Sequence, residues 1–366
     1  MRTVEAAVSH GPRDLEITEV GLGDPEADEV LVDVSAVGVC HTDYARYANS
    51  QESGAPVVLG HEGAGVVKTV GERVTTLDPG DRVVLTVTTQ CGSCGPCQRG
   101  EPFLCANDGP IHNGCMPDGT RRLSLDGAPA DHFFAQSSFA EQAVVPATTA
   151  VPVPDDVPLE VACLLGCGAT TGIGAVLSTA EVSPGESVAV FGCGGVGTSA
   201  LLGAELIGAS PLVAVDVDRR RLAAAADFGA THTVDPTDVD PVNQIETITE
   251  GGPAYTIECS GAPQAQKQAL AAVRKGGMAV IVGGGHDDRL EVHPERDLLP
   301  GGKTIVGSVA GSVRPRHDVP RYARLYADGH LDLDALVTQQ YDLTELETAF
   351  AHLEHGKGLR GVVTFE

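Results

Sequence analysis

The sequence predicts an α/β fold with two domains, one of them built on a doubly wound parallel sheet. Three observations predict this fold class. The chain has 366 residues, more than a single domain usually contains. Its first part shows short apolar stretches separated by Pro and Gly, which is typical of a β-rich domain. Its later part alternates strand and helix patterns, which indicates a parallel sheet covered by helices.

The β-rich domain is predicted to contain residues 1–157 and 309–366. Val30 begins a stretch that alternates like a half-buried strand. The polar, glycine-rich stretch 106–138 is expected to be a long loop, and loops of that length are usually functional. The tail adds a helix and a closing strand. The elements expected in this domain are strands at 30–37, 65–70, 82–87 and 362–365 and a helix at 345–355.

The parallel-sheet domain is predicted to contain residues 158–308. It begins with a long helical candidate, Leu159–Ala180, which Gly166-Cys-Gly168 interrupts. Strands and helices alternate after it, as in a doubly wound sheet. The strands are expected near residues 188–191, 212–215, 255–258, 278–282 and 304–309.

A glycine turn lies at the centre of this second domain. An apolar strand, Val188-Ala-Val-Phe191, runs into it, and a helix over 198–208 follows. Gly192, Gly194 and Gly197 have the spacing G-x-G-x-x-G. The first glycine permits the tight turn, the second lets a pyrophosphate approach the backbone, and the third lets the helix pack on its strand. The N–H groups at the helix start then suit a diphosphate.

An acidic residue follows the next strand. Asp216 comes about 20 residues after the turn, where a partner for the ribose 2′-hydroxyl is expected. A carboxylate there repels a 2′-phosphate, so the sequence favours NAD over NADP. The arginines at 219–221 weaken that preference.

The composition favours a globular, cytoplasmic protein. Hydrophobic residues make up 42% of the chain, enough for sizeable cores. No apolar run reaches the roughly 18 residues that a membrane-spanning helix needs, and the first residues lack the apolar core of a signal peptide. We therefore expect no membrane partner.

The chain is also strongly acidic. Its 50 acidic and 24 basic side chains give a net charge of −26, without a basic stripe. This argues against nucleic acid as a partner. Charge repulsion destabilises a compact state at low salt, whereas the Debye length falls to about 3 Å at 1 M salt. We hypothesise a halophilic source; the alternative is an acidic enzyme from an ordinary cytoplasm.

Ten cysteines in a cytosolic chain are better explained as metal ligands than as disulfides. Cys91, Cys94, Cys97 and Cys105 lie on one loop, and four thiolates at these spacings close a tetrahedral zinc site. Such a site has no open position, so its expected role is structural.

A second metal site is dispersed along the chain. Cys40, His61 and Cys167 each lie in a glycine-containing motif. Each is weak evidence alone, because a lone buried Cys or His is usually part of a core. Together, two Cys and one His leave the fourth zinc position open, which is the pattern of catalytic sites. Zinc there lowers the pKa of an alcohol oxygen and polarises an aldehyde.

These motifs together resemble those of zinc-dependent alcohol dehydrogenases of the medium-chain dehydrogenase/reductase family. The resemblance extends almost end to end and is strongest to the horse-liver-like and thiol-dependent formaldehyde dehydrogenase branches. It implies a GroES-like catalytic domain and a Rossmann domain, the latter contributing Cys167. The motifs are Gly-Val-Cys-His-Thr-Asp43, Gly-His-Glu-Gly-Ala-Gly65, the four-cysteine loop, Gly-Cys-Gly-Ala-Thr-Thr-Gly172, the glycine turn and Gly-Lys-Gly-Leu-Arg360.

The resemblance also implies residue roles. Glu62 is expected just behind the catalytic zinc and enters its coordination transiently. Asp43 is expected to orient His61, and Thr42 to pass the substrate proton towards the cofactor ribose. The positions implied to contact or position the dinucleotide are His41, Thr171, Gly192, Gly194, Gly195, Val196, Gly197, Asp216, Arg221 and Arg360.

The chain departs from this pattern in two places. Ala45 stands where horse-liver-like enzymes have the His that ends the proton relay, with Tyr44 and Tyr47 nearby. Val87 replaces a larger aromatic residue of some relatives, which is expected to widen the substrate pocket. The remaining cysteines are interpreted as small apolar fillers: Cys115, Cys163, Cys193 and Cys259.

The expected function is reversible hydride transfer between a small alcohol and NAD, with two zinc ions per chain. One alternative is an S-(hydroxymethyl) thiol-adduct, threonine or polyol dehydrogenase on the same scaffold; Cys167 argues against the polyol branch, which usually has Glu there. A second alternative is a zinc protein that binds a dinucleotide without turnover. By analogy we expect a homodimer, with a tetramer as the alternative.

Overall fold

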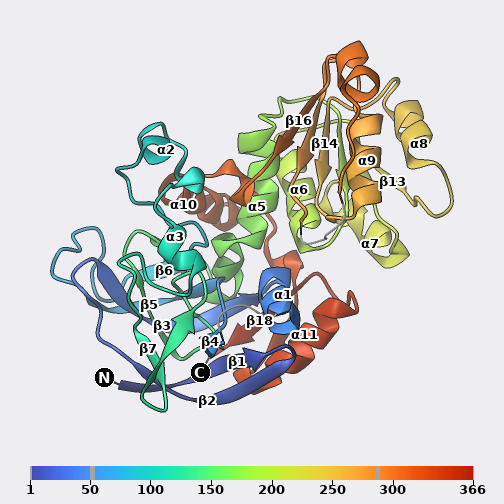
Figure 1. Cartoon of the computed structure of the whole chain (residues 1–366). Coiled ribbons are helices and arrows are strands. Elements are labelled where there is room, and N and C mark those ends of the chain that lie inside the picture. The colour runs from blue at the N-terminus through green and yellow to red at the C-terminus, as the bar shows by residue number, and fades with distance from the viewer. Residues whose placement is uncertain (1, 50–53, 285–288, 366) are drawn as a thin grey trace. The chain divides into compact units, whose positions relative to one another are not determined.

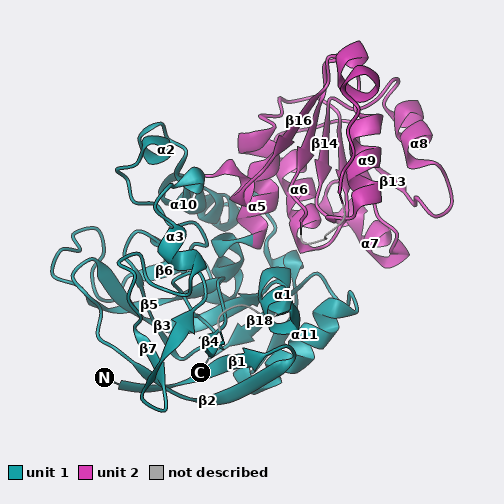
Figure 2. Cartoon of the chain, in the orientation of Figure 1, with its two compact units in different colours: residues 1–167, 314–366 teal, residues 168–313 magenta. Residues whose placement is uncertain are grey.

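The computed structural model describes residues 2–49, 54–284 and 289–365. The chain divides into two compact units (Figure 2). Unit 1 contains residues 1–167 and 314–366, and unit 2 contains residues 168–313. These boundaries differ from those expected after residues 157 and 308. Cys167 is therefore part of unit 1. The backbone N–H of Val87, just after the strand Arg82–Leu85, donates to the Gly166 carbonyl (3.0 Å) and ties this segment to unit 1.

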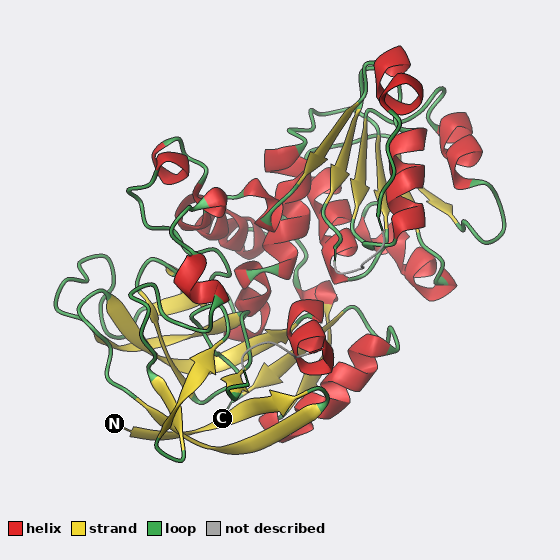
Figure 3. Cartoon of the chain, in the orientation of Figure 1, coloured by secondary structure: helices red, strands yellow, loops and turns green. Residues whose placement is uncertain are grey.

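Unit 1 is built from a closed barrel and a seven-stranded sheet (Figures 1 and 3). The barrel follows the order β1-β2-β7-β8-β4, and the sheet follows β10-β6-β5-β3-β18-β17, with β9 also paired to β3. The strands are β1 (Arg2–Gly11), β2 (Asp14–Leu22), β3 (Glu29–Val39), β4 (Val57–Val58), β5 (Gly63–Val70), β6 (Arg82–Leu85), β7 (Leu123–Leu125), β8 (Ala128–His132), β9 (Gln142–Pro146), β10 (Ala150–Pro152), β17 (Val337–Tyr341) and β18 (Arg360–Thr364).

Strand β3 is more central than its sequence pattern predicts. It pairs with β5, β9 and β18, and almost all of its residues are buried. Leu31 packs in the barrel core, whereas Val30 and Val32 pack in the second core of unit 1. The prediction of a half-buried strand was wrong, because both faces of β3 are covered.

The α-helices described in unit 1 have nine residues or fewer, apart from α10, which has 13. The expected helix at 345–355 is α11, whose Phe350 ring stacks on Tyr47 with a centroid distance of 5.0 Å. This contact fixes the helix that carries the residues after Cys40. The helices are α1 (His41–Asn49), α2 (Gly95–Gln98), α3 (Gly109–His112), α4 (Leu159–Ala162), α10 (Pro315–Ala327) and α11 (Leu346–Glu354).

The stretch 106–138 is not a plain loop, since it contains α3, β7 and β8. A buried charge network fixes it. Arg122, whose side chain is 7% exposed, donates to both carboxylate oxygens of Glu29 at 2.8 Å and to Asp118 at 2.8 Å. The backbone N–H of Arg122 donates to His132 Nε2 at 2.9 Å. Burial lowers the pKa of His132 to about 3, so this ring is neutral near pH 7.

Unit 2 contains the predicted parallel sheet. Its strand order is β13-β12-β11-β14-β15-β16, every neighbouring pair is parallel, and helices flank the sheet (Figure 3). The sequence missed only β13 at the sheet edge. The elements are β11 (Val188–Phe191), β12 (Leu212–Val215), β13 (His232–Val234), β14 (Tyr255–Glu258), β15 (Met278–Ile281), β16 (Thr304–Gly307), α5 (Gly168–Gly174), α6 (Gly195–Leu206), α7 (Arg219–Ala224), α8 (Pro241–Ile248) and α9 (Pro263–Ala272).

The expected interruption of the helix over 159–180 is present: helix ends at Gly166 and resumes at Gly168. Within the described parts of the chain, no single helix is long and apolar enough to cross a membrane. The bent pair Leu159–Gly166 and Gly168–Thr179 meets the length and composition criteria only when the two are taken together.

Candidate active site

Four side chains from three segments of unit 1 meet at one point. Cys40 follows β3, His61 and Glu62 precede β5, and Cys167 follows a turn of 3₁₀-helix. Their ligand atoms all lie within 4.8 Å of one another, and His61 and Glu62 are fully buried. The geometry thus brings together the dispersed residues that the sequence singled out.

His61 is held in an orientation that suits a metal ligand. Its Nδ1 lies 2.8 Å from Oδ2 of Asp43, and both side chains are fully buried. The backbone N–H of Gly60 donates to the other oxygen of Asp43 at 3.0 Å. Nε2 of His61 is buried and has no hydrogen-bond partner among the described residues. A ring anchored through Nδ1 and open at Nε2 is the usual arrangement of a zinc-binding histidine.

The charges around this cluster shift its pKa values. Burial raises the pKa of Asp43 and that of Glu62, the latter to about 7. Burial opposes a charged His61, but the nearby Asp43 and Cys40 outweigh that effect and raise the pKa of His61 well above its usual value. The Asp43 carboxylate and the His61 imidazole therefore stabilise each other's charged forms, against the effect of burial.

Arg360 lies inside the same cluster. It is 5% exposed and donates to Oε2 of Glu62, which is fully buried. Burial opposes the charged guanidinium, but Glu62 and Cys40 raise the pKa of Arg360 well above its usual value. The resemblance implied only a cofactor contact for Arg360. The structure adds that this residue neutralises the carboxylate behind the cluster, which the sequence did not indicate.

Two helix positions after Cys40 were expected to serve catalysis and cofactor binding. Thr42 Oγ1 lies 3.7 Å from Cys40 Sγ at the exposed start of α1, where His41 is also exposed. The hydroxyl groups of Tyr44 and Tyr47 bind other side chains. Arg13 donates to the Tyr44 hydroxyl (2.8 Å), and the Tyr47 hydroxyl donates to Glu347 (3.1 Å).

The four-cysteine loop forms the second cluster. The sulfur atoms of Cys91, Cys94, Cys97 and Cys105 all lie within 4.8 Å of one another. Backbone N–H groups donate to two of them: Cys94 N–H to Cys91 Sγ (3.3 Å) and Ala106 N–H to Cys94 Sγ (3.5 Å). Hydrogen bonds from Ser93 lower the pKa of Cys91 to about 5. Hydrogen bonds also lower the pKa of Cys94, whereas burial raises the pKa of Cys97 and Cys105. Four thiolates in this arrangement would form a tetrahedral zinc site.

The remaining cysteines belong to neither cluster. Cys115, Cys163 and Cys193 are buried, and Cys259 is half-buried, all as free thiols. Burial raises the pKa of Cys193 to about 12, so this thiol is protonated at neutral pH.

The glycine turn of unit 2 has the geometry that its spacing predicts. Gly192 has a φ of +85°, which favours glycine. A Cβ on Gly197 would lie 1.7 Å from the Gly192 carbonyl oxygen, so only glycine lets α6 pack this closely. Gly194 precedes the first turn of α6, which contains Gly195 and Val196. The backbone N–H groups at the start of this helix suit an anion.

Asp216 lies beside this turn at the end of β12. Its carboxylate accepts the backbone N–H groups of Cys193 (2.6 Å) and Asp218 (2.8 Å). Arg221 lies 3.7 Å from the same carboxylate, and its Nε is buried without a hydrogen-bond partner among the described residues. Thr171 lies in α5 of the same unit. These contacts hold the Asp216 carboxylate beside the glycine turn.

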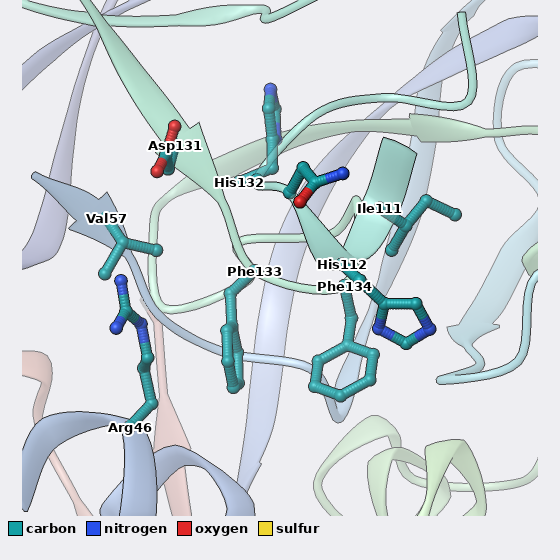
Figure 4. Close-up of a pocket in the computed structure, with 10 residues that line it drawn as sticks. Arg46, Val57, Ile111, His112, Asp131, His132, Phe133 and Phe134 are labelled. Atoms are coloured by element: carbon teal, nitrogen blue, oxygen red, sulfur yellow. The ribbon is translucent and has the colours of Figure 1, made fainter. Parts of the chain in front are cut away.

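An aromatic pair next to His61 was missed by the sequence reasoning. The rings of Phe133 and Phe134 pack against the His61 ring with centroid distances of 5.7 and 5.3 Å. Both also line a pocket of about 570 Å³ in unit 1 (Figure 4). Val87 is not among the residues that line this pocket. The only sequence signal that could have indicated this aromatic pair is the occurrence of two adjacent phenylalanines in a chain that contains 8 phenylalanines.

Comparisons with known proteins agree with this geometry. Residues 26–155 match the model of the alcohol dehydrogenase GroES-like domain, and residues 195–328 match that of the zinc-binding dehydrogenases. The chain is 38% identical to an alcohol dehydrogenase class-3 of Cereibacter sphaeroides, with both chains fully covered. It is 39% identical to an S-(hydroxymethyl)glutathione dehydrogenase of Escherichia coli, covering 98% of this chain and 99% of that protein.

A solved structure extends the likeness to the whole fold. The benzyl alcohol dehydrogenase of Acinetobacter calcoaceticus superposes with a TM-score of 0.95 at 37% identity, and each chain is fully covered. The family match, the two ligand clusters and the glycine turn support zinc and a pyridine nucleotide as cofactors. The chain therefore belongs to the zinc-dependent alcohol dehydrogenases of the medium-chain dehydrogenase/reductase family.

Proposed function

We propose that this protein is a NAD-dependent alcohol dehydrogenase that interconverts a small alcohol and its aldehyde or ketone. The observation that carries the proposal is the meeting of Cys40, His61 and Cys167, with ligand atoms within 4.8 Å. Two thiolates and one imidazole form the three-ligand set of a catalytic zinc site. The four-cysteine loop provides a structural site, which gives two zinc ions per chain.

Zinc at the three-ligand site supplies a Lewis acid, which lowers the pKa of a hydroxyl group and polarises a carbonyl. The chain's own residues provide the rest. Asp43 fixes the tautomer and orientation of His61. Thr42 accepts the substrate proton at Oγ1, close to Cys40, and passes it on. Ala45 provides no further acid or base, so the relay ends through the cofactor ribose and water.

The proposed preference for NAD rests on Asp216. Its carboxylate lies at the end of β12 beside the glycine turn, where it accepts hydrogen bonds from two backbone N–H groups. A 2′-phosphate brought to this carboxylate meets like charge, which costs several kcal/mol. His41, Thr171, Arg221 and Arg360 complete the proposed contacts with the dinucleotide.

A second candidate function is oxidation of an S-(hydroxymethyl) thiol adduct. The relative of Escherichia coli named for this activity covers 98% of the chain at 39% identity, which favours it. The same metal site and the same proton path serve both reactions, since each oxidises a hydroxymethyl group.

Metal analysis and an alcohol panel test this proposal. We expect two zinc ions per purified chain and NAD reduction, followed by the absorbance of the reduced nicotinamide, with simple alcohols or with a formaldehyde–thiol adduct. We expect NAD to exceed NADP in kcat/KM by about tenfold or more, and the Asp216→Ser variant to narrow that ratio. Zinc and NAD binding without turnover of any alcohol or adduct would instead indicate a non-catalytic protein.

The acidic surface leads to a further prediction. We propose a salt-rich cytoplasm as the protein's setting, where its ten cysteines stay reduced and outside disulfides. We also propose a homodimer as its assembly. With a net charge of −26, raising KCl from low to molar concentration should raise the melting temperature by at least a few degrees, because salt screens the repulsion. Greater stability in low salt would contradict the halophilic setting.

A further inference from the structure

A buried carboxylate lies at the end of one of the two central strands of unit 2. Glu258 is the last residue of β14, which pairs in parallel with β11 and with β15, and its side chain is fully buried. A carboxylate is costly to bury unless hydrogen bonds satisfy its oxygens. Glu258 belongs to neither zinc cluster and is not among the residues proposed to contact the dinucleotide.

The turn that follows β14 supplies three hydrogen-bond donors to this carboxylate. Oε1 of Glu258 accepts from the backbone N–H of Ser260 (2.8 Å), from the Ser260 hydroxyl and from the backbone N–H of Gly261 (3.0 Å). The Ser260 hydroxyl oxygen accepts the backbone N–H of Ala262 (3.1 Å), which precedes α9. Hydrogen bonds to a carboxylate are roughly twice as strong as those between neutral groups. Glu258 therefore fixes the conformation of the turn Cys259–Gly261.

Close backbone contacts hold the same turn between two other segments. A Cβ on Gly192 of the glycine turn would lie 2.8 Å from Ser260 Cβ, and a Cβ on Gly283 would lie 2.1 Å from the Gly261 nitrogen. Gly261 itself has a φ of +73°, in the left-handed region that favours glycine. The turn Cys259–Gly261 is therefore packed between the glycine turn after β11 and the segment after β15.

The place of this turn in the sheet assigns it to one half of a dinucleotide. The strand order reverses between β11 and β14, and ligands of such sheets bind in the crevice beyond the carboxyl ends of the strands at this point (Figure 1). The half-sheet of β11, β12 and β13 has the glycine turn and Asp216, which are the features expected at the adenosine half. By the same rule, the half-sheet of β14, β15 and β16 receives the nicotinamide half.

We propose that Glu258 is a positioning residue, whose carboxylate holds the turn Cys259–Gly261 in the shape that receives the nicotinamide half of the cofactor. This inference rests on the proposed function, since it requires a pyridine nucleotide in this crevice. Glu258 acts through the turn and not on the reacting atoms. A loosened turn should therefore weaken binding of the whole dinucleotide but not binding of its adenosine half.

Calorimetric binding of NADH and of AMP to the zinc-containing protein tests this inference without turnover; NADPH replaces NADH if it binds more tightly. Glu258→Met removes both acceptor oxygens at similar side-chain length, so the buried donors of the turn lose their partner. We expect the dissociation constant of NADH to rise by about tenfold or more and that of AMP to change by less than about twofold. Glu258→Gln keeps one acceptor oxygen and should weaken NADH binding by about three- to tenfold.

The matched control is Glu186→Gln. Glu186 also accepts a backbone N–H, that of Ser183 at 3.0 Å, but it precedes β11 and so lies at the opposite edge of the same sheet. This variant should bind NADH as the native protein does. In turnover, Glu258→Gln should raise the KM for NAD more than it lowers kcat, because the reacting groups are unchanged.

Native-like NADH binding by folded Glu258→Met would overturn the inference, and native-like binding by Glu258→Gln would do so if Glu258→Met does not fold. Equal losses of NADH and AMP binding would also overturn it, because they would indicate a general loosening of unit 2. The expected losses in a protein that oxidises no alcohol or thiol adduct would refute the proposed function and leave the role of Glu258 standing.

Discussion

The Cys40→Ser variant should lose one of its two zinc ions and lower kcat/KM by on the order of 10³-fold or more. The serine hydroxyl is a far weaker zinc ligand than a thiolate, and only two strong ligands, His61 and Cys167, remain in the cluster. Loss of a Lewis acid removes several kcal/mol of transition-state stabilisation, and each 1.36 kcal/mol is a factor of ten. Metal analysis and steady-state kinetics measure both effects.

A matched control keeps this result interpretable. Cys163 is buried in the same unit but belongs to neither cluster, and its thiol contacts the Glu160 carbonyl at 3.4 Å. A serine there keeps that hydrogen bond, so Cys163→Ser should retain both zinc ions and turnover. The circular dichroism of both variants should match that of the native protein. Full turnover by Cys40→Ser with a single zinc per chain would show that the dispersed cluster is not the catalytic site.

Removing Arg122 should cause the largest loss of stability. Glu29 is buried and has both carboxylate oxygens bound by this guanidinium at 2.8 Å. Arg122→Met fills similar space but leaves the Glu29 carboxylate buried without its partner. Breaking a buried pair in this way costs about 3–5 kcal/mol. Urea unfolding at neutral pH, in molar KCl, measures the free energy of unfolding.

The exposed pair Arg99–Glu101 provides the comparison for this prediction. Its side chains are 61% and 40% exposed, and such pairs contribute less than about 1 kcal/mol. Arg99→Met should therefore leave the free energy of unfolding nearly unchanged. The double variant Glu29→Gln/Arg122→Met should regain part of the loss, because it removes the unpaired charge. Equal effects of Arg122→Met and Arg99→Met would show that the buried network is not a major source of stability.

The sequence predicted those parts of the fold that depend on local patterns. The five strands of unit 2 and the glycine turn follow from short apolar runs and from spacing, and the structure contains them. The burial of β3 on both faces could not be predicted, because it depends on strands β9 and β18, which lie far along the chain. The edge strand β13 was missed because only Val234 of its three residues is buried.

The candidate site likewise has some residues that local patterns predict and others that depend on distant parts of the chain. The four cysteines of residues 91–105 could be assigned from spacing alone. Cys40, His61 and Cys167 lie far apart in the chain and are each weak evidence alone, so the sequence indicates them only as a set of ligand types. The pairing of Arg360 with Glu62 and the packing of Phe133 and Phe134 on His61 could not be read from the sequence. Each depends on which distant side chains share a small volume, and residue spacing contains no information about that.

From the separation of the two ligand clusters along the chain, we expect them to take up metal in a fixed order during folding. The ends of the 91–105 segment are close in sequence, so the entropy cost of bringing its thiols together is small, and this cost grows with loop length. That segment acquires its ion as a local event. The other centre joins residues 40 and 167 and exists only after the intervening barrel strands have paired. We therefore expect its occupancy to report that the part of unit 1 between residues 40 and 167 has folded.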